Sequence, residues 1–455
     1  MAEILRGFRR ARCNTGMWID SRPQTFSSKH SHVGWPFLNC QSQRNPPSTV
    51  PFPTLSGETL DEIFKFFGPF DEDAICYHRN NHCLINCSLV SFEWRAVAIP
   101  LIWSRLKFDY RMSRDKVLEQ LAFSATESRS HVHQRNHHGI NYVQSIIVIP
   151  PAPMVKGDLL ALAAPVARIV QLFSPNQLQE VIIYHTHTHL IPFSSFLATT
   201  LFPNLTCSVT NLVLHSTGHT FASADKLVLD NLPNSLETFK FSTVNIYGIG
   251  APSCFVRLLS LPNLRDLELD SIDTIDPAAF AQALRNWGSW LRRLSITSCH
   301  NLTRDAVVSA LADACPNLTT FRLAVNTAFY QYVEEESLCR LVDACTGLKS
   351  LNLLHVQAVS NRFLAHCASR ARALQMLHIS DRWFQTTGKG VVDVSAWTGM
   401  KELVISHGFI EEEIEMDVVF VQAVAKLSRG MKAYGDTIHC DDNNYTWSQP
   451  LSERL

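Results

Sequence analysis

The chain has 455 residues, of which 46% are hydrophobic and 18% are charged, and its formal net charge is -1. This is the composition of a globular protein with ample apolar material for a core. The near-neutral charge gives no electrostatic reason to expect a nucleic acid or an anionic membrane as partner. The sequence contains no uninterrupted run of about 18 apolar residues, so no membrane span is predicted.

Residues 1–50 are expected to form a disordered leader. They contain seven Lys or Arg and two acids, with scattered Ser, Asn and Pro and no sustained hydrophobic period. The first dozen residues lack the apolar run of a secretory signal, and Glu3 and the absence of serine there argue against a mitochondrial presequence. Trp18, Trp35 and Phe37 are candidates for a docking motif, but a plain leader is the simpler interpretation.

Three short helices are predicted between Pro53 and Trp103. In the first, apolar residues recur at i, i+3, i+4 and i+7 on one helix face, namely Leu60, Ile63, Phe64 and Phe67. A polar insert at 71–82 follows, and two further helices are separated by a break near Ser91. Such a unit is too small to be stable alone, so it must pack on a neighbour or a partner.

The last two of these helices contain a specific pattern. It reads Cys87-Ser-Leu-Val90-Ser91-x-x-Trp94-Arg95, followed by Pro100-Leu101-x-Trp103. Together with Pro53 and Leu55, which open the segment, and with the first helix, this pattern makes residues 51–108 resemble an F-box. The sequence is similar to those of many fungal F-box proteins. Two departures are a second proline, Pro51, and the long polar insert.

The F-box resemblance implies a partner. F-boxes bind a Skp-type adaptor, which tethers them to a cullin–RING ubiquitin ligase. By the same resemblance the adaptor-binding residues are Pro53, Leu55, Ile63, Leu84, Val90 and Trp94. The alternative is that these residues only close a small helical cap on the segment that follows.

A repeated phrase, apolar-x-x-apolar-x-apolar, runs through the rest of the chain. Its copies start at residues 143, 178, 209, 236, 264, 291, 318, 348, 374 and 400, and the last five steps are 27, 27, 30, 26 and 26 residues long. A candidate strand at 106–108 precedes them. Repeats of this period indicate a solenoid, because one unit cannot bury its own apolar face. The final apolar pair of each phrase faces one side of a strand, and the connecting segments have helical spacing.

One copy of the phrase is nearly complete, with Leu291, Leu294, Ile296, Cys299 and Leu302 following the pattern L-x-x-L-x-L-x-x-C. It resembles the longer, cysteine-containing leucine-rich repeats. The expected fold is therefore α/β, a small three-helix F-box followed by an irregular leucine-rich-repeat solenoid with a parallel sheet on the concave side and helices on the convex side. The expected domains are a leader (1–50), the F-box (51–108), the solenoid (109–430) and a polar C-terminal tail (431–455).

Capping residues support the connecting helices. Asp276 followed by Pro277 is an N-cap with proline at the first helical position, and Thr303 and Ser360 are further predicted N-caps. The acidic run 411–417 precedes a last predicted helix at 418–427, where negative charge suits a helix N-terminus. About ten strands would span on the order of 45 Å, which is a protein-sized surface.

The thirteen cysteines are interpreted as packing residues. Cys315 and Cys345 each lie three residues before a phrase, where a small apolar side chain in the solenoid explains them better than a disulfide does. A reducing compartment, the cytosol or the nucleus, is therefore expected.

Metal and catalytic chemistry is not expected. His185, His187 and His189 alternate along a strand, but they follow a repeat phrase directly and have no carboxylate or thiol close in sequence. The group Cys76, His78, His82, Cys83 and Cys87 forms no C-x-x-C pair, and the histidines of 130–139 are typical of a polar loop. The common hydrolase, phosphate-binding and dinucleotide-binding motifs are missing. We therefore expect no metal, no cofactor and no enzymatic activity.

The residues between the apolar positions of each strand are predicted to face the concave side. The candidate target-binding residues among them are Asp266, Glu268, Arg293, Arg322, Asn352, Met376 and His378. They form either a recognition patch with rim charges or a plain inter-strand charge ladder. Whether a target binds the concave or the convex side is left open.

The sequence thus favours a substrate-recognition subunit of a Skp–cullin–F-box ubiquitin ligase, with the F-box on the adaptor and the repeats on a target protein. One alternative is a leucine-rich-repeat scaffold for protein–protein interaction without a ligase. A second is an enzyme that uses a reactive cysteine or a bound metal among the many Cys and His residues.

Overall fold

The structure is a computed structural model. It describes residues 87–109, 142–149, 177–185, 209–216, 229–243, 255–325, 333–381, 386–391, 393–407, 437–442 and 445–446, with isolated positions at 56, 58–60, 84, 166, 169–171, 173, 201, 203, 419 and 423. The chain divides into two units, Met1–Thr54 and Leu55–Leu455, and all described residues belong to the second. The predicted leader and the F-box residues Pro53, Leu55 and Ile63 lie outside the described residues.

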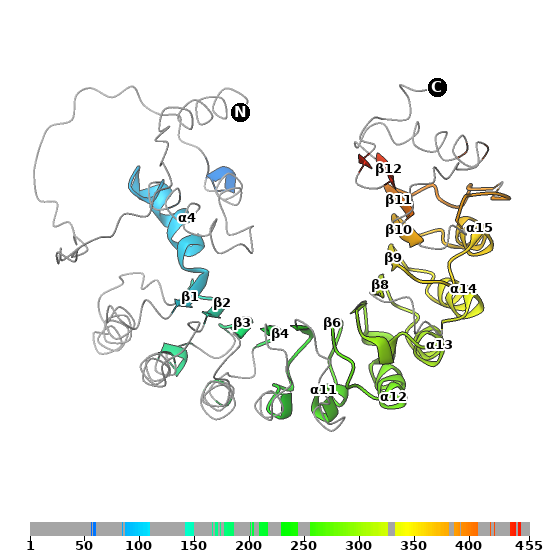
Figure 1. The fold of residues 1–455 in the computed structure, drawn as a ribbon. Coiled ribbons are helices and arrows are strands. Elements are labelled where there is room, and N and C mark those ends of the chain that lie inside the picture. The colour runs from blue at the N-terminus through cyan, green and yellow to red at the C-terminus, as the bar shows by residue number, and fades with distance from the viewer. Residues whose placement is uncertain are drawn as a thin grey trace, which may run out of the picture. The chain divides into compact units, whose positions relative to one another are not determined.

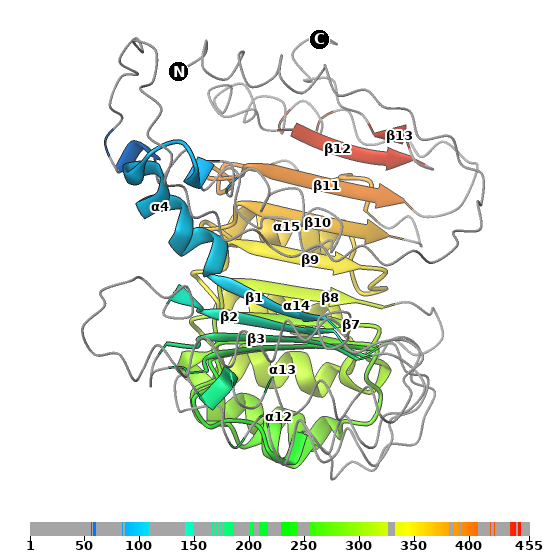
Figure 2. The same cartoon turned by 90° about the vertical axis from the view of Figure 1, so that its left-hand side faces the viewer.

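One continuous sheet carries the second unit (Figures 1 and 2). Its thirteen described strands lie side by side in chain order, and all are parallel except the last, which runs antiparallel to the twelfth. The strands are β1 (Arg105–Asp109), β2 (Ser145–Ile149), β3 (Glu180–His185), β4 (Asn211–Ser216), β5 (Thr238–Thr243), β6 (Asp266–Asp270), β7 (Arg293–Thr297), β8 (Thr320–Ala324), β9 (Ser350–Leu354), β10 (Met376–Asp381), β11 (Glu402–His407), β12 (Thr437–Asp442) and β13 (Tyr445–Thr446). The ten phrase copies form β2 to β11, so the predicted α/β solenoid is confirmed.

Helices connect the strands on one side of the sheet, the outer side in Figure 1. The described helices are α4 (Phe92–Trp103), α11 (Val256–Leu259), α12 (Pro277–Trp287), α13 (Asp305–Ala314), α14 (Glu335–Ala344) and α15 (Asn361–Arg370), with single 3-10 turns at Gly288–Trp290 and His300–Leu302. From α12 to α15, one helix follows each strand. Each buries an apolar stripe toward the strands, as Phe280, Leu284 and Trp287 do in α12.

The core depends on pairing in register. Leu267 of β6 pairs with Leu294, which pairs with Phe321, so equivalent apolar residues of successive repeats form a continuous row. These side chains are almost completely buried. Each buried leucine contributes about 1.5–3 kcal/mol relative to exposure, but only when the neighbouring repeat supplies the other half of its environment.

Two of the three predicted N-caps are confirmed. The Asp276 carboxylate accepts the Ala279 N–H at 2.8 Å, and Ser360 Oγ accepts the Arg362 N–H at 3.1 Å. The prediction for Thr303 is wrong. Its hydroxyl donates to the His300 carbonyl at 2.9 Å and so closes the preceding 3-10 turn, and α13 begins only at Asp305.

The ends of the helices are tied to the next repeat by buried side-chain donors. Trp287 Nε1 donates to the Leu261 carbonyl at 2.9 Å, and Trp397 Nε1 donates to the Cys367 carbonyl at 3.1 Å. Cys345 Sγ does the same for the Cys315 carbonyl at 3.3 Å. The Cys367 and Cys315 carbonyls also accept backbone N–H groups, from Ala371 and Leu318, so these side-chain donors add a second hydrogen bond that links one repeat to the next.

The sheet extends beyond the predicted solenoid at both ends. β1 confirms the candidate strand at 106–108, which lies within the range predicted for the F-box, and β12 lies in the segment predicted as a polar tail. β12 lacks the apolar phrase, but it pairs with β11 over Thr437–Asp442. Backbone ladder bonds do not require apolar side chains, which is why the phrase alone underestimates the length of the sheet.

Three residues directly after strands have left-handed backbone conformation. They are Ser271 (φ 60°), Ser298 (φ 53°) and His355 (φ 59°). The bend lets their N–H groups continue the sheet, as when the Ser298 N–H donates to the Ala324 carbonyl at 2.8 Å. A non-glycine residue in this region is strained, and the buried Ser298 hydroxyl has no hydrogen-bond partner among the described residues.

We therefore expect Ser298→Gly to raise the free energy of unfolding by about 1 kcal/mol, because glycine adopts positive φ without strain and removes the unbonded hydroxyl. Chemical denaturation of the full chain measures the change. Ser295→Gly in β7 is the matched control and should lower stability by roughly 0.5–1 kcal/mol, since glycine weakens a strand interior. A loss of stability in Ser298→Gly would contradict this assignment of strain.

Candidate protein-binding surfaces

A small helical cluster precedes the sheet. Leu60, Leu84, Cys87 and Ala98 are buried together, and Trp94, Val97, Leu101 and Ile102 pack against them while half-buried. Ser91 begins α4 at the predicted break, where its hydroxyl accepts the Trp94 N–H at 3.2 Å and donates to Glu93 at 2.7 Å. The hydrogen bond from Ser91 is the main cause that lowers the pKa of Glu93.

Two aliphatic side chains stand outside this cluster. Leu89 is 67% exposed and Val90 is 61% exposed, in the turn just before the N-terminus of α4. The turn is held on both sides, because Val90 N–H donates to the Cys87 carbonyl at 3.1 Å and Arg95 Nε donates to the Ser88 carbonyl at 3.1 Å. Large apolar side chains fixed in this exposed position suit a contact with another protein.

The predicted adaptor-binding residues that are described differ in how exposed their side chains are. Val90 is exposed and Trp94 is half-buried. Leu84 does not face outward: it is fully buried in the cluster, because it supplies the apolar contact that the short helices need. Leu89, which the sequence analysis did not select, lies beside Val90, and the adjacent letters Leu-Val before the Ser91 cap were the signal for the pair.

The helical cluster is continuous with the repeats. α4 ends at Trp103 and β1 starts at Arg105, with Ser104 between them. Ser104 Oγ donates to the Leu101 carbonyl at 2.8 Å, and its own carbonyl accepts the N–H groups of Gln144 and Ser145 at 2.8 and 3.0 Å. One residue therefore joins the end of the helix to the first pair of strands.

The second surface is the face of the sheet opposite the buried core, here called the open face. Alternate strand residues point to opposite faces, and in β6, β7 and β9 every second residue is buried. The seven predicted target-binding residues are all in the exposed or half-buried alternation, on strands β6 to β10. Pairing in register brings Arg322, Asn352 and His378 side by side in one row across three strands.

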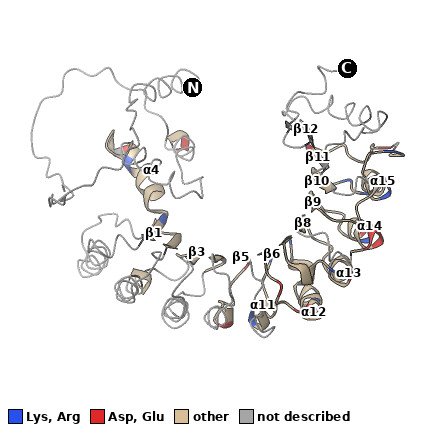
Figure 3. Cartoon of the chain, in the orientation of Figure 1, with Lys and Arg blue, Asp and Glu red and all other residues tan. Residues whose placement is uncertain are grey.

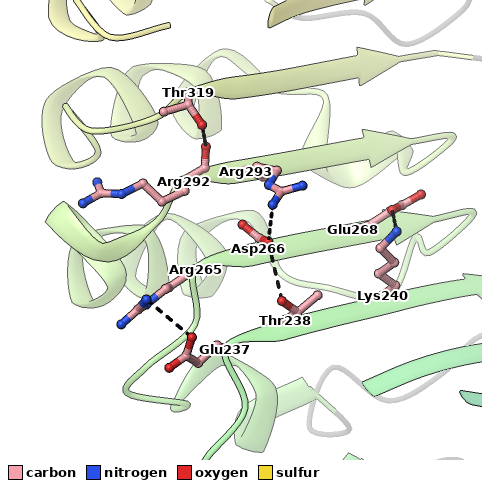
Figure 4. A network of polar contacts seen from close by, with 9 residues as sticks. All are labelled: Glu237, Thr238, Lys240, Arg265, Asp266, Glu268, Arg292, Arg293 and Thr319. Carbon is pink, nitrogen blue, oxygen red and sulfur yellow. Dashed lines mark hydrogen bonds and ion pairs between the residues drawn. The ribbon is translucent and has the colours of Figure 1, made fainter. Parts of the chain in front are cut away.

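Charges on the first part of this face are paired (Figure 4). Arg293 lies 3.3 Å from Asp266, and Lys240 lies 3.3 Å from Glu268. At least one side chain of each pair is about half exposed or more, so each pair contributes little to stability, about 0–1 kcal/mol. Burial is the main cause that raises the pKa of Asp270, while its hydrogen bond to Ser271 opposes the rise.

The second part of the row is less satisfied. The Arg322 side chain is exposed and forms no ion pair with any residue in the described ranges. Asn352 beside it has a buried amide oxygen without a hydrogen-bond partner among them. His378 Nε2 lies 3.1 Å from Glu402, and Met376 is 37% exposed next to it. Such a mixture of hydrogen-bond donors and one apolar side chain is chemically suited to binding the surface of another protein.

The open face also has an apolar part, which was not predicted. Ile147, Ile182 and Val213 occupy the equivalent middle positions of β2, β3 and β4; Ile147 and Val213 are half-buried and Ile182 is buried. Beside them, the rings of Tyr184 and His215 are stacked with centroids 4.8 Å apart. The clue was present in strands that are apolar on both faces, such as Glu180-Val-Ile-Ile-Tyr184, where one face would have been polar if it met only water.

Two adjacent residues of β8 point to opposite faces of the sheet, and their substitution should change the free energy of unfolding by different amounts. We expect Leu323→Ala to cost about 2–5 kcal/mol of unfolding free energy because it leaves a cavity in the core. Arg322→Ala should change it by less than about 0.5 kcal/mol, because this exposed side chain forms no hydrogen bond or ion pair with the described residues and only its charge favours the nearby Asp270 carboxylate. Thermal and denaturant unfolding of both variants measure the difference, and a strongly destabilised Arg322→Ala would show that this side chain is structural.

A shallow groove of about 510 Å³ lies between α14 and α15 on the helical side. Its charged residues are paired across it: Arg362 lies 2.9 Å from Glu336, and His366 lies 3.1 Å from Asp343. These pairs hold the two helices together and leave few side chains oriented toward a ligand.

The cysteines whose side chains are described, namely Cys87, Cys299, Cys315, Cys339, Cys345 and Cys367, are free thiols, and all but Cys339 are buried. Burial raises the pKa of Cys315 to about 12 and that of Cys345 to about 11, and it also raises that of Cys299. A thiol rather than a thiolate is thus present at neutral pH, and the thiol is a poor nucleophile. These positions act as packing residues and as weak hydrogen-bond donors, as the sequence analysis expected for Cys315 and Cys345.

This burial has a pH consequence. The folded-state pKa of Cys345 lies above its ordinary value of 9, so its contribution to stability is complete below pH 9 and is lost as pH rises toward 11. We expect the stability difference between the wild type and Cys345→Ala to shrink by about 1 kcal/mol between pH 9 and pH 10. Denaturant unfolding at a series of pH values measures it, and a pH-independent difference would contradict it.

The described residues contain no group of three or more His, Cys, Asp or Glu that could hold a metal ion. His187 and His189 lie outside the described residues, as do Cys76, His78, His82, Cys83 and the histidines of 130–139. In the part of the chain that is described, no helix has the length and apolarity needed to cross a membrane.

Comparison with known proteins finds similar structures, whereas neither a protein family nor a curated protein sequence matches the chain. Among solved structures, the complex of Rad7 and Elc1 from yeast is similar with 15% identity and a TM-score of 0.43, over 72% of this chain and 84% of the other. A complex of TLR13 with the single-stranded RNA ssRNA13 is similar with 13% identity and a TM-score of 0.32, over 61% of this chain and 37% of the other.

Proposed function

We propose that this chain is the substrate-recognition subunit of a Skp–cullin–F-box ubiquitin ligase in the cytosol or nucleus. The helical cluster binds the Skp-type adaptor, and the repeats hold a target protein. The observation that carries the proposal is the exposed Leu89–Val90 pair, fixed beside the capped start of α4 in the segment whose sequence resembles an F-box.

The adaptor surface centres on this pair. A small helical interface takes most of its binding energy from a few apolar anchors, and Leu89, Val90 and the edge of Trp94 supply them here. The resemblance adds Pro53, Leu55 and Ile63. Leu84 supports the surface from within, because its buried side chain holds the turn and α4 together.

The target surface is the open face. Its residues are Asp266, Glu268, Arg293, Arg322, Asn352, Met376 and His378, together with the aliphatic positions of β2 to β4. The Arg322–Asn352–His378 row offers hydrogen-bond donors to a polar segment, while the half-buried aliphatic positions Ile147 and Val213 suit apolar side chains of the same target.

The role of the chain would be proximity and orientation, with the ubiquitin chemistry performed by other subunits. The single-residue connection at Ser104 supports this role, because it joins the adaptor-binding helix to the first strands without a flexible linker. No cofactor or metal is needed for such a function.

A second candidate is a repeat scaffold for protein–protein interaction that works without a ligase. The direct passage from α4 into β1 favours it, since a helical cap that only closes the end of a solenoid would be joined in the same way. The two functions differ in whether the chain binds an adaptor.

Adaptor binding is tested by co-purification of the full chain with its host's Skp-type adaptor. We expect Val90→Asp to weaken the complex by about tenfold or more, because it places a charge in the apolar contact. Val256→Asp is a matched control, since Val256 is 63% exposed on α11 and Val90 is 61% exposed. This control should bind as the wild type does.

Circular dichroism on all three proteins shows whether each is folded. A complex lost only in Val90→Asp supports the receptor function. A folded wild type that captures no adaptor excludes the ligase function and leaves the scaffold, and equal binding by Val90→Asp would show that the exposed pair is not the contact.

A further inference from the structure

Basic residues precede the strands β6 to β11, whereas acidic residues follow the strands β6 to β8. The turns that lead into these strands span 261–265, 288–292, 315–319, 345–349, 371–375 and 397–401, and all of them are described. They contain no Asp or Glu but five basic residues, here called the basic edge: Arg265, Arg292, Lys349, Arg372 and Lys401.

The opposite edge, where the strands end, is acidic. The segments that lead from it into α12, α13 and α14 carry Asp273, Asp276, Asp305, Glu334 and Glu335. Helices here run against the strands, so their N-termini lie at the strand ends, where negative charge is favourable. The acidic edge therefore has a structural cause, and Figure 3 marks the acidic and basic positions on the chain.

The charges of the basic edge are only partly balanced by the described residues. Lys349, Arg372 and Lys401 have exposed side chains that form no hydrogen bond or ion pair within the described part of the chain. Arg292 Nη1 is held by the Ser289 and Asn317 carbonyls, and Arg265 lies 3.5 Å from Glu237. Figure 4 shows Arg265 and Arg292 extending from the starts of β6 and β7. The helix dipole favours a cation near a helix C-terminus, where these turns begin. This effect alone does not require five basic residues and no acidic residue in the six turns.

The spacing suits one extended peptide. Neighbouring strands are about 4.8 Å apart, so the starts of β6 to β11 span roughly 24 Å, the length of about seven extended residues. Carboxylates of such a peptide would lie within reach of successive cations, and arginine binds carboxylates with a two-pronged geometry. A broad polyanion such as duplex DNA fits less well, because Asp266 and Glu402 lie next to the edge and the acidic edge is about 17 Å away.

We propose that the basic edge binds an acidic, extended segment of a protein partner, across the starts of β6 to β11. The inference rests on the proposed function, since it specifies the chemistry of the target that the repeats would hold. The open face then contacts the rest of the target, and the acidic segment fixes its direction across the strands.

The probe is a fluorescein-labelled oligoglutamate peptide long enough to span the edge, and its anisotropy is measured with the full chain at low and physiological salt. We expect Lys349→Glu/Lys401→Glu to bind the peptide at least about tenfold more weakly, because two attractive contacts become repulsive. The matched control is Arg304→Glu/Lys389→Glu, which changes the net charge equally at exposed positions near the acidic edge. It should bind within about twofold of the wild type.

Three results would overturn the proposal. They are no peptide binding by the wild type, an equal loss in both double variants, and displacement of the peptide by oligothymidylate at the same concentration as by unlabelled oligoglutamate. Adaptor capture is measured on the same preparations. A chain that binds the adaptor but not the peptide refutes this inference and keeps the proposed function. A chain that binds the peptide but not the adaptor refutes the proposed function and keeps the peptide-binding site.

Discussion

The structure depends on one constraint: each repeat must pair in register with the next. Leu267, Leu294 and Phe321 occupy the same position in three strands, and each is buried only because its neighbours are aligned. A shift of one residue in any strand would place its apolar residues on the open face and its charges in the core. The buried donors at the helix ends reinforce this alignment, since Cys345 and Trp397 each reach a carbonyl of the preceding repeat.

The same constraint produces the surfaces. Because the inward residues are fixed by packing, the outward residues of each strand form rows whose composition is free to vary along the chain. The row that begins with Ile147 and Ile182 continues through Lys240 and Glu268 and reaches Arg322. Apolar side chains, ion-paired charges and unpaired charges thus follow one another along the sheet. A protein partner bound across the strands would contact them in this order.

The sequence determined the strands well and the surfaces less well. The phrase placed β2 to β11 because burial of three apolar positions per repeat is a strong periodic demand. It could not place β12, whose pairing rests on backbone hydrogen bonds, nor reject Thr303 as a cap, since the competing 3-10 turn is a local backbone choice.

For the candidate sites, the sequence indicated which side of each strand is outward, so the target residues could be selected by position. It could not distinguish Leu84 from Val90 in the helical cluster. Both are apolar letters in short helices, and only the packing of those helices decides which one is buried and which is exposed.

The two buried tryptophans give the array built-in optical reporters. Trp287 and Trp397 are both fully buried, and each indole donates to a backbone carbonyl of the repeat before it. Indole emission depends on this dry, hydrogen-bonded environment, so each ring reports on one junction between repeats. The junctions lie several repeats apart, and two chains that each keep only one of these rings among the nine tryptophans would therefore reveal whether the array opens as a whole or from one end.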